Sequence, residues 1–463
     1  MEFGHQVIVT EFSRPESLEY LAARTGLSDL AGAEAVAEEL GDLPLALAQA
    51  AATIRRQNLT YVKYLGRLRR IPLEDLMNQL PSGEYPRSTA AALMMSIQAT
   101  EDNHQTGLTS QILRVLAALS PHGVGREILD GLTVNGSSAS EEDIDAAIER
   151  CTTGSLLTWS VNGDSVIMHR LLGRVLRERD KSAGRWAETV GAALDLLELR
   201  LIPPEQAWSR RTEGERLATQ IDALWEADLG IGDSAPPLRM RILKARSWVV
   251  RQLLSAADYS GAIARGRPTL SECEGILGAA HPETLSLSID LADAYRWAER
   301  PDEAIMLSEQ TVALCQEALG DDHALTLKAR NELAGAYRTA RRLDEAVALY
   351  RRTLADQERV LGADHPDTLL SCSNLGFACR LAGQLDEATA LYERALADRQ
   401  RVLGANHPDT LMSRSNLGFA YGVAGRLDEA IALHERTLAD RERVLGADHP
   451  RSEERRVGKE CLE

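Results

Sequence analysis

The sequence predicts a mainly α-helical protein whose C-terminal half is a solenoid of stacked helical hairpins. Its 463 residues suggest about three domains, and only 4% of them are aromatic. Ala, Leu, Glu and Arg, which are strong helix formers, recur throughout the chain. A Gly-X-X-His motif returns every 42 residues, five times in all. Because one hairpin of this size cannot bury its apolar face alone, the copies must stack on one another.

The formal net charge of −17 disfavours bulk binding to nucleic acids and to anionic lipid. The six cysteines show no Cys-X-X-Cys pairing, which is typical of reduced thiols in a cytoplasm and indicates no zinc site. The chain shows neither a basic N-terminal region followed by an apolar run nor an apolar stretch of about 18 residues. We therefore expect a cytoplasmic protein that neither spans a membrane nor holds a metal.

Residues 1–14 come before the first expected helix. They include Val7-Ile8-Val9-Thr10, which would form a short strand. No glycine-rich loop ending in Gly-Lys-Ser or Gly-Lys-Thr occurs in the chain, and phosphate binding of this type needs such a loop at a helix N-terminus. We therefore expect no ATP hydrolysis. No pairing of a nucleophile with a base and no cluster of metal ligands predicts another enzyme activity.

Apolar residues recur at helical spacing from residue 15 to about residue 70, which predicts a helical domain over residues 15–80. Within it, residues 38–48 read Glu-Glu-Leu-Gly-Asp-Leu-Pro-Leu-Ala-Leu-Ala. Pro44 would open a new helix just after a glycine break.

Residues 86–183 predict a second domain, with two strands around Asn162-Gly163, a strong hairpin turn. Met168-His169-Arg170 follows the second strand. A lone histidine at such a junction is more often structural than functional. Helices are expected ahead of the strands, near 88–101, 108–120 and 141–151.

Together these two segments resemble the NB-ARC (STAND) family of signal-transduction ATPases. Residues 38–48 are similar to its GLPLAL motif, with Asp42 inserted as a departure, and Met168-His169-Arg170 is similar to its MHD motif, with Arg in place of Asp. The resemblance implies an ARC-like helical domain over 15–80 and a winged-helix domain over 86–183. It places Pro44 and His169 at the ADP of an intact family member. Residues 1–14 would then be the remnant of a missing nucleotide-binding domain, so that ADP or ATP is implied only for the intact parent.

Residues 185–237 predict a helical adaptor, with a boundary at Ser234-Ala235-Pro236-Pro237. The solenoid follows over residues 238–450. In one of its periods Pro366 suits a first helical position, Gly383 breaks the chain before Asp386 caps a second helix, and Gly404 ends that helix.

The repeats resemble a known family. The order Leu375, Gly376, Cys379, Ala388, Tyr392 and Ala395 is similar to the tetratricopeptide repeat, and the 42-residue period with His-Pro-Asp-Thr joints resembles its kinesin-light-chain type. The resemblance covers residues 281–450 and extends more weakly over 239–280. It implies an α-solenoid whose first helices line a concave groove.

Five histidines, one per joint, would pack or cap helix starts, because successive joints are too far apart to share a metal. They are His281, His323, His365, His407 and His449. By resemblance, polar residues of the first helices could face the groove, where arginine and asparagine can bind the backbone and carboxylates of an extended peptide. A solvated face is an equally open interpretation. The main candidates are Arg296, Lys328, Asn331, Arg338, Asn374, Arg380 and Asn416, with Asp290, Asp293 and Ser415 beside them.

Residues 451–463 break the repeat pattern and look like the translation of a sequencing adapter. We expect this tail to be non-native and residues 1–450 to be a fragment of a longer gene.

Two functions of different classes fit these features. The first is a protein–protein interaction scaffold, the sensor part of an NB-ARC-type signalling regulator. In it the repeats bind a protein or peptide, and the other modules relay this event to the ADP/ATP switch of the intact parent. The alternative is a transcriptional regulator that binds DNA through its winged helix, using the basic residues of 170–181. Residues 86–180 carry eight basic and twelve acidic side chains, which favours the first function.

Overall fold

The chain forms two compact units, Met1–Arg246 and Ser247–Glu463, in the computed structural model. The expected strand at 7–10, the helix near 88–101, His449 and the tail at 451–463 lie outside the residues that the structure describes. Those described are 12–42, 44, 47, 50–51, 54–55, 58–70, 107–134, 136–153, 156–228 and 236–445.

The first unit begins with helices that bury a shared apolar core. Ser13 caps the first helix, and both its backbone N–H and its hydroxyl donate to the carboxylate of Glu16, each at 2.7 Å. The second helix ends at Gly41, whose φ of +64° is accessible to glycine at little cost. Pro44 is helical, as expected. The bounds are α1 (Arg14–Thr25), α2 (Leu30–Leu40) and α4 (Tyr61–Arg70).

Next in this unit, three helices surround a small antiparallel sheet with the strand order β1-β5-β4. Its central strand β5 pairs Val166 with Val124 on one side and with Trp159 on the other. The helices expected near 108–120 and 141–151 and the hairpin around Asn162-Gly163 are confirmed. The bounds are α7 (Leu108–Ala118), β1 (Val124–Gly125), η1 (Arg126–Leu129), β2 (Thr133–Val134), β3 (Ser137–Ser138), α8 (Glu141–Thr153), β4 (Leu157–Trp159), β5 (Ser165–Met168) and α9 (Arg170–Ser182).

Further helices follow the sheet, as the sequence predicts for residues 185–237. Pro236 and Pro237 are the first two residues of a long helix, which fits the tolerance of a helix start for proline. The expected boundary therefore coincides with a helix start. The bounds are α10 (Trp186–Glu198), η2 (Pro204–Gln206), α11 (Arg211–Asp228) and α12 (Pro236–Ser255).

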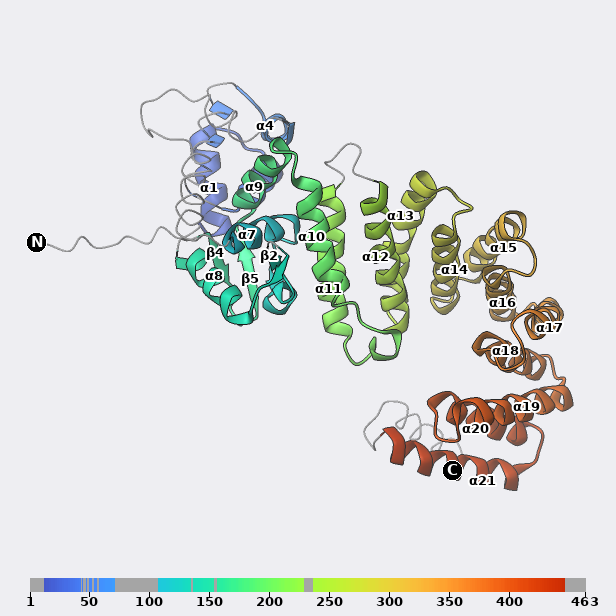
Figure 1. The fold of residues 1–463 in the computed structure, drawn as a ribbon. Coiled ribbons are helices and arrows are strands. Elements are labelled where there is room, and N and C mark those ends of the chain that lie inside the picture. The colour runs from blue at the N-terminus through green and yellow to red at the C-terminus, as the bar shows by residue number, and fades with distance from the viewer. Residues whose placement is uncertain are drawn as a thin grey trace, which may run out of the picture. The chain divides into compact units, whose positions relative to one another are not determined.

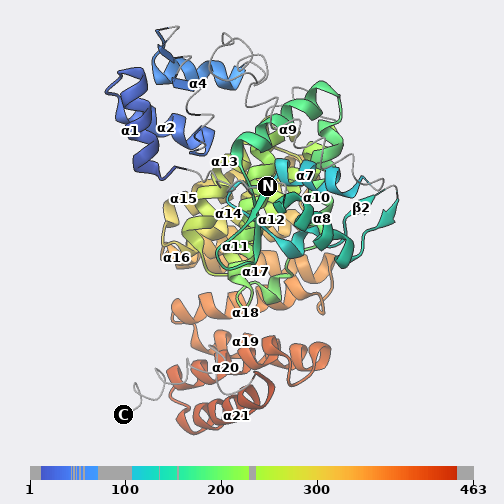
Figure 2. The ribbon, with the colours of Figure 1, turned by 90° about the vertical axis from the view of Figure 1, so that its left-hand side faces the viewer.

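The second unit is a stack of antiparallel helix pairs, in which each helix packs on the next one in the chain. In Figure 1 the pairs follow a curved path, with α14, α16 and α18 on its inner side and α15 and α17 on its outer side. Figure 2 shows α18, α19, α20 and α21 as successive layers. The bounds are α13 (Tyr259–Leu277), α14 (Pro282–Trp297), α15 (Pro301–Leu319), α16 (Ala324–Thr339), α17 (Leu343–Val360), α18 (Pro366–Leu381), α19 (Leu385–Leu403), α20 (Pro408–Val423) and α21 (Leu427–Leu445).

The joint histidines cap the first helix of each pair, which confirms the interpretation of His281, His323, His365 and His407. In each case the ring Nδ1 accepts a hydrogen bond of 3.2 Å from the backbone N–H two residues later. Gly404 ends α19 at a φ of +89°, also as expected.

The expected cap of the second helix is wrong. Leu385 is already helical and Gln384 is the N-cap, so Asp386 lies inside the first turn. There its charge interacts favourably with the positive end of the helix dipole.

The solenoid and the helices before it make the protein mainly α-helical, as the sequence predicts. Among the residues that the structure describes, no helix is both long and apolar enough to cross a membrane.

Candidate functional site

The first helices of the repeats, α14, α16, α18 and α20, carry every candidate groove residue (Figure 1). Neighbouring first helices contact each other directly, as α14 does with α16 and α16 with α18. Residues 42 apart occupy equivalent positions, so the same column of the repeat can be compared from helix to helix.

In the first two repeats the candidates pair with one another. The carboxylate of Asp290 lies 3.5 Å from Arg251 and 3.4 Å from Lys328. Arg296 pairs with Asp293 on its own helix and with Glu332 on the next, the latter at 3.4 Å. These cations therefore already have carboxylate partners within the unit.

Burial shapes the acidity of this cluster. Burial raises the pKa of Asp290 against the opposing effect of Lys328 and Arg251. Burial and the nearby Asp293 raise the pKa of Glu332, although Arg296 and Lys328 oppose them. Asp290 and Glu332 are therefore harder to ionise in the folded state than in the unfolded chain.

The substitution Glu332→Gln is expected to raise the melting temperature at pH 8, on the order of 2 °C or more, and to leave it unchanged near pH 4. With a raised folded pKa, the penalty for an ionised Glu332 is absent below the unfolded pKa. The penalty is complete above the pKa of the folded state. The glutamine variant is therefore more stable than the parent only at higher pH. Thermal unfolding by circular dichroism across this range measures the effect.

Asp364 is a control of opposite sign. Arg401 lowers the pKa of this exposed carboxyl, so Asp364→Asn should lose a little stability at pH 8 and none at low pH. A gain at pH 8 for Asp364→Asn, or none for Glu332→Gln, would contradict the assigned directions.

The candidate asparagines do not occupy one continuous column of the groove. Asn331 is buried, and its carbonyl oxygen accepts from the hydroxyl of Ser371 at 2.9 Å and from the amide of Asn374 at 3.4 Å. It lies eight residues after its joint histidine, whereas Asn374 and Asn416 lie nine after theirs. Asn331 and Asn374 thus tie α16 to α18, and Asn416 is half-buried on α20.

A row of stacked side chains runs along the last three first helices. The guanidinium carbons of Arg338 and Arg380 lie 4.6 and 4.7 Å from the centroid of the Phe377 ring. That of Arg380 also lies 4.7 Å from the centroid of Phe419, whose side chain is 53% exposed. We call Arg338, Phe377, Arg380 and Phe419 the arginine–phenylalanine row.

Sequence reasoning found the arginines of this row but missed its phenylalanines. Phe377 and Phe419 are 42 residues apart. Each stands three residues before the repeat position that Arg296, Arg338 and Arg380 occupy in the other repeats or in its own. That spacing places them on the same helix face as the arginines, and it was the available signal.

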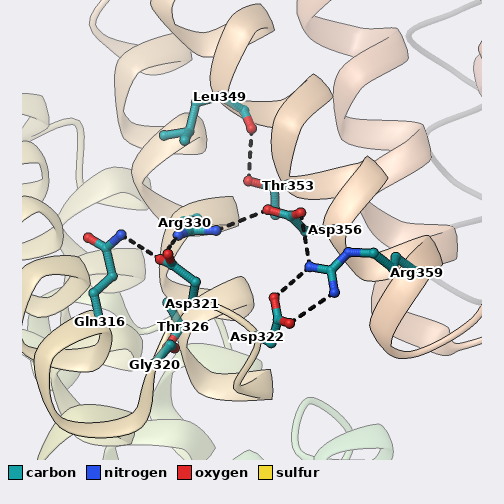
Figure 3. Close-up of polar contacts among 10 residues, drawn as sticks. All are labelled: Gln316, Gly320, Asp321, Asp322, Thr326, Arg330, Leu349, Thr353, Asp356 and Arg359. Carbon is teal, nitrogen blue, oxygen red and sulfur yellow. Dashed lines mark hydrogen bonds and ion pairs between the residues drawn. The ribbon is translucent and has the colours of Figure 1, made fainter.

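A second network lies at the joints and was not expected from the sequence (Figure 3). The buried Arg330 pairs with Asp321 and, at 3.2 Å, with Asp356. Arg359 pairs with Asp322 in a bidentate contact and also reaches Asp356 at 3.3 Å. All five residues belong to one repeat, so this network holds the end of α17 to the start of α16.

In the first unit, His169 meets the end of α2. Its Nε2–H donates to the backbone carbonyl of Gly41 at 2.8 Å. Two arginines of α9 pair with the same turn, Arg170 with Glu38 and Arg174 with Glu39, each at 3.0 Å. The structure thereby places His169 in direct contact with Gly41, which stands three residues before Pro44 in the motif of residues 38–48.

Comparison with known proteins supports the repeats. The tetratricopeptide-repeat family model matches residues 283–358, 331–397 and 368–443. No curated protein matches the chain.

Similar solved structures include a putative kinesin light chain with tetratricopeptide-like repeats from Podosopora anserina, at 29% identity and a TM-score of 0.40 over 46% of this chain and 98% of that one. BtubC from P. vanneervenii has 19% identity and a TM-score of 0.41, over 53% of this chain and 93% of that one. A STAND protein with a tetratricopeptide-repeat sensor from Pyrococcus horikoshii has 12% identity and a TM-score of 0.37, over 96% of this chain and 61% of that one.

Proposed function

Because residues 283–443 of this chain are tetratricopeptide repeats, we propose that the second unit captures a protein or an extended peptide on its first helices. The observation that carries this proposal is the arginine–phenylalanine row. Arginine and aromatic side chains that are partly exposed supply much of the binding energy in protein interfaces. The row offers both, and it continues over three successive repeats.

We further propose that the chain is a non-enzymatic sensor part of a cytoplasmic NB-ARC-type regulator. The ARC-like and winged-helix assignments are supported by the helices of residues 12–70 and by the antiparallel sheet flanked by α7, α8 and α9. The contact between His169 and Gly41 supports a relay, because it joins the two motifs that resemble nucleotide contacts. In the intact parent, Pro44 and His169 would contact ADP. Five cysteines among the described residues are buried and form no disulfide with one another, which fits a reducing compartment.

Two observations weigh against the DNA-binding alternative. The helix α8, which precedes the hairpin, begins with Glu141, Glu142 and Asp143 and would meet the phosphates of a nearby duplex with negative charge. The basic helix α9 is already engaged, since Arg170 and Arg174 pair with α2. This leaves the repeats as the favoured binding unit.

The proposal is tested by selecting a phage-displayed library of random peptides on the full-length chain. Selected peptides are expected to compete with one another and to slow amide hydrogen exchange in α14, α16, α18 and α20. Exchange in the outer helices α15 and α17 should change less. Failure to select any peptide, or protection confined to the first unit, would overturn the proposal.

A further inference from the structure

We infer that the ligand is seated on the arginine–phenylalanine row and that it is an acidic segment with two carboxylates placed two or three residues apart. This inference rests on the proposed function and narrows it to one half of the solenoid and one ligand chemistry. Three observations carry it: two arginines of the row lack a carboxylate partner, they lie a defined distance apart, and apolar side chains are exposed beside them.

The arginine column is not uniform. Arg296, Arg338 and Arg380 occupy the same repeat position, 42 residues apart. Arg296 is neutralised by Asp293 and Glu332. Among the residues that the structure describes, neither Arg338 nor Arg380 has a carboxylate within the 4.0 Å of an ion pair. Two adjacent repeats thus present cations whose charge the unit leaves uncompensated.

Contacts with aromatic rings orient the guanidinium groups of Arg338 and Arg380. Both guanidinium groups stack on the Phe377 ring, and Arg380 also stacks on Phe419. The charges of Arg338 and Arg380 also act on Tyr350 and Tyr392, respectively, where they oppose the rise in the pKa of each tyrosine that burial causes. Stacking fixes the plane of a guanidinium and leaves N–H groups at its edge, which is the geometry that binds a carboxylate with two parallel hydrogen bonds.

The spacing of the row sets the spacing of the carboxylates. Neighbouring helices pack about 8–10 Å apart, and the two guanidinium groups share a single ring. An extended chain advances about 3.3 Å per residue, and a polyproline-type chain about 3.1 Å. Two or three residues therefore span the distance between the arginines. In a polyproline-type chain, residues three apart also lie on the same side.

The surroundings suit an acidic ligand with apolar neighbours. In α18 and α20 the acidic residues Asp367 and Asp409 both stand in the first turn, so no acid accompanies the row along these helices. Apolar side chains are exposed on the same two helices. They are Leu370, Met412, Phe419 and Val423.

The experiment is the same peptide selection, read out by sequence and followed by fluorescence anisotropy of the selected peptides with the full-length chain. Pairs of Asp or Glu separated by two or three positions should be enriched over the starting library. Replacing either acid by its amide should weaken binding about tenfold, as should Arg338→Gln or Arg380→Gln in the protein. Because the amide peptides leave the protein untouched, the inference stays testable even if an arginine variant is less stable.

Arg296→Gln is the matched control, since it removes an arginine from the same column that already has acidic partners. It should change affinity less than about twofold. Peptides selected without an acid pair, or affinities equally sensitive at all three arginines, would overturn the inference while the proposed function stands. Failure to select any peptide overturns both.

Discussion

Replacing the buried Arg330 with alanine is expected to destabilise the second unit by about 3 kcal/mol and to lower its melting temperature by roughly 6–12 °C. The side chain is only 2% exposed and bonds to Asp321 and Asp356. Its removal leaves a cavity. It also deprives Asp356, whose side chain is 25% exposed, of its ion pair with a buried arginine. Differential scanning calorimetry of the full-length chain measures the loss.

Arg359→Ala is the matched control for this prediction. Arg359 belongs to the same network and also reaches Asp356, but its side chain is 57% exposed (Figure 3). Ion pairs in water contribute about 0–1 kcal/mol, so this variant should melt within a few degrees of the parent. Equal losses for the two variants would show that burial does not decide the contribution of the network.

The second large effect is expected at the contact between the two parts of the first unit. Gly41→Ala should destabilise this unit by about 3 kcal/mol. Part of the loss, about 1–2 kcal/mol, comes from the positive φ of +64°. The rest comes from overpacking, because an added Cβ would stand only 2.6 Å from the His169 Nε2. Protection of α2 and α9 in hydrogen exchange measures the loss locally.

Gly26 separates these two causes. It also ends a helix at a positive φ, +73°, but an added Cβ there meets nothing within 4 Å. Gly26→Ala should therefore cost only the backbone part of the effect. In the double variant Gly41→Ala with His169→Ala the clash is absent, so the two losses should be less than additive. Strict additivity would argue against direct contact.

The 42-residue spacing was enough to predict the helix pairs and the histidine caps, because both depend on residues close in the sequence. The start of the second helix was missed because Asp386 favours the cap position and the first turn alike. In the first unit, helical periodicity predicted the helices but could not show that His169 contacts Gly41, 128 residues away.

The candidate site was harder to predict than the fold. Arg296 and Arg338 occupy the same repeat position, but Asp293 stands three residues before Arg296 where Gly335 precedes Arg338, and the neighbouring helix adds a second difference. Arg296 meets Glu332 across the joint, whereas Arg338 meets Phe377. Asn331 looked like a ligand contact because it is polar, yet it is buried and bonded between two helices. Repeat position gives the direction of a side chain, whereas its partners come both from its own helix and from the next repeat.

The joint networks bear on how the array can change in length. Arg330, Asp321 and Asp356 all lie within one 42-residue window, and so do Arg414 and Asp440 in a later one. These two repeats thus each contain the countercharge for the arginine that they bury at this position. Unequal recombination that inserts or deletes either of these two periods therefore separates neither Arg330 nor Arg414 from its acid, and gene duplication can add a copy of either repeat without first evolving a compensating substitution.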